Sequence, residues 1–379
     1  MIKSNEFYSY NTKELPVGCQ YCVRGEKIVL FITGKCPRKC YFCPVSDEKF
    51  GKDVTFANEK KVEDFSDVIQ EAENMDAKGA GITGGDPLMT LDKTCDFIKK
   101  LKQKFGKEFH IHLYTSLNLA TEKSLKQLYD AGLDEIRFHF DFDDKTFWKK
   151  ISLPSKFDWD IGVELPLIPE KEKETKEVID LIHDKVQFIN LNELERADNT
   201  LSKLSDMGME VKETYSYAIK GSLGLGFKLM KYVEDQKYDL AVHLCTAKLK
   251  DGIQLTNRIK REGEHNHKAF DIVDDEGLLT RGALYLYGLK PGFDYRKKLL
   301  AADKDKYIIK LKPLFDRIKK KFKLSDEDIY LDEEKPRILI SRKLVKKKKA
   351  YFLGIDLFPA IVTEYPTADQ LEIEVDFLN

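Results

Sequence analysis

The sequence lacks a long apolar run, an excess of charge of either sign, an internal repeat and a low-complexity linker. No stretch approaches the roughly 20 consecutive apolar residues that span a bilayer, and residues 1–16 are polar and mixed in charge. Lys and Arg total 64 against 65 Asp and Glu, so the overall charge gives no reason to expect binding to nucleic acid or membranes. We therefore expect a cytoplasmic protein without a membrane partner.

Cysteine is also scarce, and its distribution is uneven. The chain has seven cysteines in 379 residues, and five of them lie between Cys19 and Cys43. Disulfide frameworks are typical of small secreted chains, whereas clustered thiols in a chain of this length fit metal binding in a reducing compartment. The cysteines therefore predict metal ligation.

Three of these thiols, Cys36, Cys40 and Cys43, follow an apolar run at 29–33. Their spacings of four and three residues let them converge on one soft metal centre. Thiolates are the usual ligands of iron–sulfur clusters, and three ligands on a four-iron cube leave one iron open. There are two alternatives. The three cysteines could be part of a zinc site, which usually needs four ligands, or they could be buried thiols of the core.

This CxxxCxxC run, with Phe42 before its third cysteine, resembles the signature of the radical S-adenosylmethionine (radical SAM) superfamily. The resemblance implies that the triad binds a [4Fe–4S] cluster and that the open iron holds S-adenosylmethionine. It further implies reductive cleavage of that cofactor to a 5′-deoxyadenosyl radical, which abstracts hydrogen from a substrate. An external electron donor of the ferredoxin or flavodoxin type is expected with it.

Beyond the triad, strand-like and amphipathic helical segments alternate at the spacing of βα units. We predict an α/β chain: a radical SAM (β/α) partial TIM barrel of six strands or more over 25–250, with a smaller α+β module over 251–379 and an N-terminal segment, 1–24. The barrel resembles the branch related to pyruvate formate-lyase activating enzymes. The number of predicted strands is compatible with an open six-stranded barrel and with a nearly closed eight-stranded one. Residues 209–219 are counted as one of these strands.

The run Gly84-Gly85-Asp86-Pro87 ends a predicted strand. Glycines let a backbone approach a ligand closely, although the same run suits an ordinary turn. It resembles the family's GGEP element, which implies binding of the cofactor's methionine amino group through backbone carbonyls. Aspartate replaces the usual glutamate, which leaves such backbone contacts possible.

Polar residues at later strand ends are further candidates for cofactor binding. Buried polar groups need partners, and the carboxyl ends of barrel strands are where sites form. A surface row of ion pairs and a helix cap are the alternatives for some of them. The candidates at strand ends are Ser116, Asn118, His139, Glu164 and Asn192, and Phe42 in the cysteine run is a further candidate.

A second set of metal ligands is split along the chain. Cys19 and Cys22 form a CxxC knuckle, and His243 and Cys245 are two residues apart on an apolar strand, so they share a face. Together they make a Cys₃His set for zinc or an auxiliary iron–sulfur cluster, with zinc favoured by the imidazole. The alternative is that His243 and Cys245 are core residues, as we expect for Cys95 in its helix.

The C-terminal module carries two basic runs, 319–323 and 342–349, and a predicted β segment at 350–355. Clustered lysines can follow a phosphate backbone, although such runs are more often solvated. The substrate is therefore open between a tRNA base, a protein and a small metabolite. The non-enzyme alternative is a zinc-stabilised binding protein.

Overall fold

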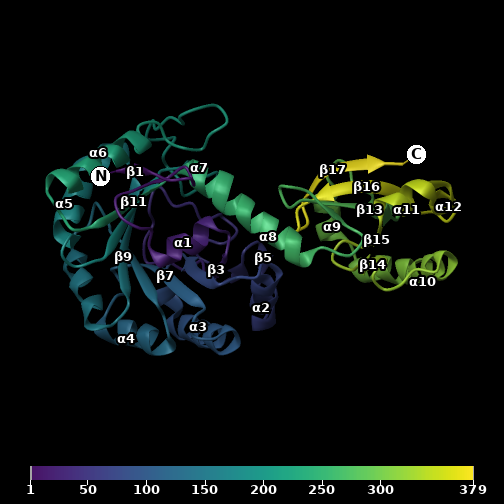
Figure 1. Ribbon diagram of the computed structural model, residues 1–379, viewed down its shortest axis with the longest axis horizontal. Helices are drawn as coiled ribbons and strands as arrows, with labels where there is room; N and C mark the ends of the chain where they lie inside the picture. Colours follow the sequence, from purple (N-terminus) through teal and green to yellow (C-terminus); the bar gives the residue numbers. More distant parts are fainter. Residues whose placement is uncertain (1, 379) are drawn as a thin grey trace. The chain divides into compact units, whose positions relative to one another are not determined.

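The computed structural model describes residues 2–378. The chain divides into two compact units, the first ending at Arg258 and the second beginning at Ile259, within helix α8 (Thr256–Asn266) (Figure 1). The segment 1–24 belongs to the first unit. Among the described residues, no helix has the length and apolar character needed to cross a bilayer.

The first unit is built on a curved sheet of parallel strands with helices on its outer side (Figure 1). The sheet is open, because its end strands β3 and β11 pair with short antiparallel strands and not with each other. This confirms the predicted α/β partial barrel, with seven parallel strands, a number between the two alternatives. In spatial order they are β11 (Ala241–Cys245), β10 (Phe188–Glu193), β9 (Asp160–Leu167), β8 (Glu135–His139), β7 (His110–Ser116), β6 (Gly79–Gly84) and β3 (Lys27–Thr33).

Helices connect these strands in the order expected for βα units. They are α2 (Phe65–Asn74), α3 (Leu91–Phe105), α4 (Glu122–Ala131), α5 (Glu172–Ile182) and α6 (Ser222–Asp235). Shorter elements are α1 (Val17–Val23), α7 (Ala247–Leu249), the π-helix η5 (Lys250–Leu255), the 3₁₀ turns η1 (Pro87–Thr90), η2 (Trp148–Ser152), η3 (Pro154–Lys156) and η4 (Pro169–Lys171), and the edge strands β1 (Lys3–Ser4), β2 (Tyr10–Asn11), β4 (Phe56–Ala57) and β5 (Lys60–Lys61).

Alternation along the strands separates an apolar outer row from a polar inner row. On β7, Ile111 and Leu113 are fully buried in the main core, and His110 and His112 lie on the opposite face. The apolar side chains of the outer row pack against the apolar faces of the helices. The inner row supplies the site.

Two predicted segments differ from the structure in the first unit. Cys19 and Cys22 lie in the regular helix α1 and not in a knuckle; Pro16 precedes it, at a position proline tolerates. Residues 209–219 form only isolated bridges, Glu195 to Ala218 and Val211 to Ile219. Tyr215 and Tyr217 are exposed, so this segment has no apolar row to bury in a sheet.

The second unit is an antiparallel sheet in the order β14-β15-β13-β16-β17, with β12 paired to β13. Its strands are β12 (Ile272–Val273), β13 (Leu279–Tyr285), β14 (Ile329–Asp332), β15 (Arg337–Ile340), β16 (Phe358–Glu364) and β17 (Glu372–Phe377), and its helices are η6 (Tyr287–Leu289), α9 (Tyr295–Ala301), α10 (Lys304–Phe322), α11 (Arg342–Lys347) and α12 (Lys349–Leu353). The predicted strand at 350–355 is wrong. The segment is mostly helix α12, because Phe352 enters the core shared with Leu311 and Ile318 of α10.

Helix α6 offers a matched test of packing beneath the sheet. A Cβ on Gly226 would come within 2.6 Å of a Leu244 methyl carbon and 2.9 Å of a Leu167 methyl carbon, whereas a Cβ on Gly224 meets nothing within 4 Å. We expect Gly226→Ala to lower the free energy of unfolding by about 1–3 kcal/mol through overpacking. Gly224→Ala should raise it by about 0.5–1 kcal/mol through reduced backbone entropy.

Urea unfolding followed by fluorescence of Trp148 and Trp159, both in the first unit, measures the two changes. Equal effects of the two substitutions would contradict this packing of α6 on the sheet.

Candidate functional site

One cavity of about 860 Å³ lies on the inner side of the first sheet. Its lining comes from the loop after β3, the ends of later strands, α1 and the segment after β11. Asn118 is the predicted site residue that does not line it; the backbone oxygen of Asn118 accepts a bond from Lys150 instead. The predicted residues that line it are Cys19, Cys22, Cys36, Cys40, Phe42, Cys43, Gly84, Gly85, Asp86, Ser116, His139, Glu164, Asn192, His243 and Cys245.

Cys36, Cys40 and Cys43 lie on the loop between β3 and β4, each partly exposed to the cavity. Asn199 fixes the end of this loop, because its Nδ2 donates to the carbonyl oxygens of Cys43 and Val45 at 2.9 Å. Burial raises the pKa of all three thiols, that of Cys36 to about 11. Thiolates form at such sites when a metal displaces the proton. The donor set therefore fits a thiophilic cluster.

The Gly84-Gly85-Asp86 turn is bound to this loop by its backbone. Gly85 N–H donates to Thr33 O and Asp86 N–H donates to Lys35 O, both at 2.8 Å. A Cβ on Gly85 would lie 2.3 Å from Lys35 O, and one on Gly84, whose φ is 150°, would lie 2.3 Å from Thr33 O. Both glycines are therefore required by the close approach of two backbones.

Asp86 is almost fully buried, and protein donors occupy both of its carboxylate oxygens. Oδ1 accepts from Leu88 N–H at 3.0 Å and Thr115 Oγ1–H at 2.7 Å. Oδ2 accepts from Ser116 N–H at 3.1 Å and Ser116 Oγ–H at 2.7 Å. Burial raises the pKa of Asp86, against the opposing effect of these bonds. The carboxylate thus ties the ends of β6 and β7 together, with protein donors on both of its oxygens.

His139 and Phe42 face each other edge to face, with ring centroids 5.7 Å apart. His139 Nδ1 lies 2.9 Å from the carbonyl oxygen of Glu164, and since a carbonyl can only accept, the proton is on Nδ1. Burial lowers the pKa of His139 to about 4. The ring is therefore neutral, and Nε2 keeps a lone pair that can accept from a hydroxyl.

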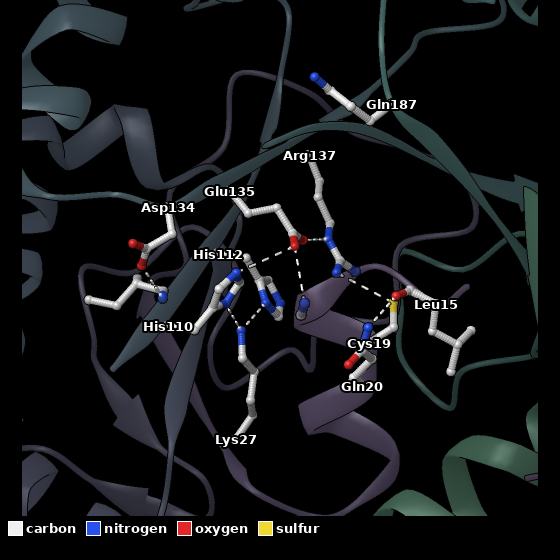
Figure 2. A network of polar contacts seen from close by, with 12 residues as sticks. Leu15, Cys19, Gln20, Lys27, His110, His112, Asp134, Glu135, Arg137 and Gln187 are labelled. Atoms are coloured by element: carbon white, nitrogen blue, oxygen red, sulfur yellow. Dashed lines mark hydrogen bonds and ion pairs between the residues drawn. The ribbon is translucent and has the colours of Figure 1, made fainter. Parts of the chain in front are cut away.

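Arg137 is the centre of a buried polar network on the inner face of the sheet. Figure 2 shows its guanidinium between Glu135 and Cys19. Nε donates to Glu135 Oε1 at 2.5 Å, Nη1 to Tyr114 Oη at 3.1 Å and to Glu164 Oε2 at 3.3 Å, and Nη2 to Cys19 Sγ at 3.4 Å. The network joins β7, β8, β9 and α1.

Lys27 extends this network toward β3 (Figure 2). Its Nζ lies 2.7 Å from His110 Nδ1 and 2.6 Å from His112 Nδ1. Burial lowers the pKa of Lys27 to about 8 and that of His110 to about 3, so the two rings are neutral acceptors for the ammonium group. Gly79 and Gly81 leave room for these side chains, because a Cβ there would meet Lys27 and His112 at 2.9 and 2.8 Å.

Glu164 connects the network to β10. Its Oε2 accepts from Asn190 Nδ2 at 2.9 Å and its Oε1 from Asn192 Nδ2 at 2.8 Å. The register places Asn190 beside His243 and Asn192 beside Cys245. The polar groups that looked unpartnered in the sequence thus find partners on neighbouring strands.

Cys19, Cys22, His243 and Cys245 share the cavity wall, but as they stand they do not converge on a point. Among residues 2–378, no three His, Cys, Asp or Glu side chains form a group that could hold a single metal ion. This applies equally to Cys36, Cys40 and Cys43.

Several residues of the inner row were missed by the sequence analysis. Lys27, His112, Tyr114 and Glu135 line or support the network. The alternation of His110, His112 and Tyr114 with apolar residues along one strand was a usable signal. Lys27 gave none, because only the pairing of β3 with β6 brings it to the histidines.

Comparisons with known proteins give the family of the chain. The sequence profile of the family described as "Radical SAM superfamily" matches residues 30–187. The protein named "Putative glycyl-radical enzyme activating enzyme MJ0021", from Methanocaldococcus jannaschii, is 35% identical over 97% of this chain and 94% of its own length. "GTP 3',8-cyclase" of Staphylococcus aureus is 34% identical over 32% of this chain and 36% of its own. The crystal structure of HydG, a maturase of the [FeFe]-hydrogenase, aligns with 65% of each chain at 13% identity and a TM-score of 0.40.

The chain therefore belongs to the radical SAM superfamily, on its activating-enzyme-like branch. It is an enzyme whose cofactors are a [4Fe–4S] cluster and S-adenosylmethionine. The resemblance predicted from CxxxCxxC and GGDP is confirmed.

Asp86→Asn tests the turn beside the cluster loop. An amide has one accepting oxygen, so its NH₂ group would face the donors of either Ser116 or Thr115 and leave them unpaired, at about 1–3 kcal/mol. We expect affinity for S-adenosylmethionine to fall about tenfold or more, measured by equilibrium dialysis on cluster-containing protein. Asp96→Asn, which removes a charge from an exposed pair with Lys100, is the control and should bind as the wild type does. Unchanged affinity in Asp86→Asn would contradict a role for this turn in cofactor binding.

Proposed function

We propose that Cys36, Cys40 and Cys43 hold the [4Fe–4S] cluster and that the enzyme abstracts a hydrogen atom from a substrate placed in the cavity. The main support for this proposal is that backbone hydrogen bonds connect the Gly84–Asp86 turn to the start of the cysteine loop, and that both segments line one rim of the cavity. Family membership supplies the cofactors, and the arrangement of the rim supports their assignment to these residues.

Held by these thiols, a [4Fe–4S] cluster reduced by an external electron donor would supply the electron for reductive cleavage of S-adenosylmethionine, and the cofactor would supply the group that takes a hydrogen atom from the substrate. The chain's own residues orient and shield this chemistry. Backbone carbonyls of the Gly84–Asp86 turn would accept from the ammonium group of the cofactor. The carbonyl of Asp86 already accepts from Met89 N–H at 2.9 Å and has a second lone pair. Nε2 of His139 can accept from a ribose hydroxyl. Burial of the inner row keeps water from a reactive radical.

Glu164, Ser116 and Asn192 have a more indirect part in this proposal. Protein donors already bond to both carboxylate oxygens of Glu164, and Ser116 is bonded to Asp86. We assign these side chains to positioning the cavity wall. Phe42 packs on His139 and holds the third cysteine of the loop next to it.

The substrate we propose first is a glycine residue of a partner enzyme. The name of the relative that matches nearly the whole chain supports it. A glycine carries no side chain, so its Cα–H can enter a cavity shared with the cofactor with little steric cost. The chain would then act as an activating enzyme for a protein radical.

A modified tRNA base is the second candidate, favoured by the basic runs of the second unit. Lys343, Lys346 and Lys347 on α11 are exposed, and no ion pair found among the described residues involves them. The two runs meet through their aromatic neighbours, since Lys321 of α10 lies over the ring of Tyr351 and Lys348 over the ring of Phe322. Adjacent cations with accessible rings suit a phosphate backbone and its bases.

Cys40→Ala tests the cluster assignment. The reduced, anaerobic wild-type protein should convert S-adenosylmethionine to 5′-deoxyadenosine, and the variant should yield less than about 1% of that product, because only two thiolates remain. Chromatography of the nucleoside product measures it. Cys95→Ala removes a thiol of α3 that does not line the cavity and should retain activity. Full activity in Cys40→Ala would overturn the assignment.

The RNA candidate predicts a strong effect of charge on tRNA affinity. Replacing Lys343, Lys346 and Lys347 together by alanine should weaken binding at least tenfold at low salt and flatten its salt dependence, as measured by filter binding between about 50 and 200 mM salt. The control removes three lysines that form exposed ion pairs within helices of the first unit, Lys100, Lys126 and Lys231. Equal affinity in both triple variants would exclude the lysines of α11 as an RNA site and favour the protein substrate.

A further inference from the structure

A second set of metal-binding side chains lies on the cavity wall, contributed by two elements. Cys19 and Cys22 are on α1, and His243 and Cys245 are on β11. Val242 and Leu244 point to the outer core, so the alternating His243 and Cys245 face inward. None of the four belongs to the loop that carries the other three thiols of the cavity.

Helix α1 is fixed in the concave side of the sheet by contacts with its polar row. Gly18 N–H donates to Glu135 Oε2 at 3.1 Å. A Cβ on Gly18 would lie 2.6 Å from Arg137 Nη2 and 2.7 Å from His112 Nδ1, so only glycine allows the helix this close. The position of the CxxC pair is therefore set by the network itself.

Two buried side chains donate hydrogen bonds to Cys19, whose thiol pKa burial raises to about 12. Its Sγ accepts from Arg137 Nη2 and from Asn190 Nδ2, both at 3.4 Å. Guanidinium and amide nitrogens can only donate, so both bonds direct positive hydrogens at the sulfur. Such N–H···S bonds support a metal-bound thiolate, in the way that outer contacts orient other ligands.

His243 has a ring nitrogen without a partner, although it is almost fully buried, at 3% exposed. Nε2 lies 3.1 Å from Ser9 Oγ, and Ser9 Oγ can donate its proton to Asn5 Oδ1 at 3.1 Å. Ser9 then accepts from Nε2–H, which leaves the lone pair on Nδ1. Nδ1 has no hydrogen-bond partner among the described residues. A buried, unpaired nitrogen acceptor in the wall of a cavity that three thiols also line is an available metal ligand.

We propose that Cys19, Cys22, Cys245 and Nδ1 of His243 bind a second iron–sulfur cluster. We favour a cluster over zinc because these four side chains, like Cys36, Cys40 and Cys43, form no group among the described residues that could hold a single metal ion. A cubane spreads its ligands over separate irons. Arg137 and Lys27 supply positive charge beside this centre. With four protein ligands the cluster has no open iron, so it does not bind a second S-adenosylmethionine.

This inference does not rest on the proposed function, and iron and sulfide analysis after anaerobic reconstitution separates the two. Two cubane clusters correspond to about eight irons per chain. The variant with Cys36, Cys40 and Cys43 all replaced by alanine, in an exposed loop, should keep about four irons and four sulfides. If this variant contains no iron, the proposed second cluster is overturned. Iron unchanged from wild type would instead overturn the assignment of the first.

Variants of the second set complete the test. Cys245→Ser should lose about four irons and keep the first cluster, and His243→Cys, which supplies a fourth thiolate, should restore iron that His243→Ala loses. Cys95→Ser should keep the full content. One equivalent of zinc with only four irons in the wild-type protein would overturn the proposed second cluster. The wild-type iron content in Cys245→Ser or in His243→Ala would also overturn it.

Discussion

The buried guanidinium of Arg137 is the interaction on which the interior of the first unit depends. It donates to Glu135, Tyr114, Glu164 and Cys19, and thereby joins three strands and helix α1. Removing one partner of such a buried network leaves an uncompensated charge, which costs about 3–5 kcal/mol. The network therefore fixes the position of α1, and with it the CxxC pair. It also means that the inner row of the half-barrel is charged, whereas the layers inside a TIM barrel are usually apolar.

A polar interior is costly unless every group is paired. Here most of it is paired across strands. The exceptions in the inner row include Nδ1 of His243 and Oδ1 of Asn190, which belong to residues lining the cavity, and Nε2 of His110, which does not. Sequences commonly depart from the rules of a stable core at functional positions. Two of the unpaired atoms therefore lie in the wall of the cavity that we propose binds substrate and cofactor, while the paired ones hold that wall rigid.

The rim of the cavity differs from the inner row of the sheet, because it is held mainly by backbone hydrogen bonds and not by side-chain contacts. The loop with Cys36, Cys40 and Cys43 is held by bonds from Gly85 and Asp86 to the chain just before it. Backbone bonds of this kind require glycine where chains approach closely, and they do not depend on a particular side chain. The Asp86 carboxylate anchors the turn to β7, which explains how an aspartate serves where glutamate is usual in the family element that the run resembles.

The sequence by itself determined the family, the α/β class and the thiol triad, because each is written in local spacing: three cysteines within eight residues, a Gly-Gly-Asp-Pro turn and the alternation of strand and helix periods. It gave the wrong structure for the CxxC pair, for 209–219 and for 350–355, where packing against distant residues outweighed local pattern. Only the tertiary structure decided that seven parallel strands form the open sheet and that Lys27, Tyr114 and Glu135 belong to the buried polar network on its inner face. These residues are brought together by strand pairings between positions far apart in the chain, and a polar residue in a strand does not state on its own which neighbour it will meet.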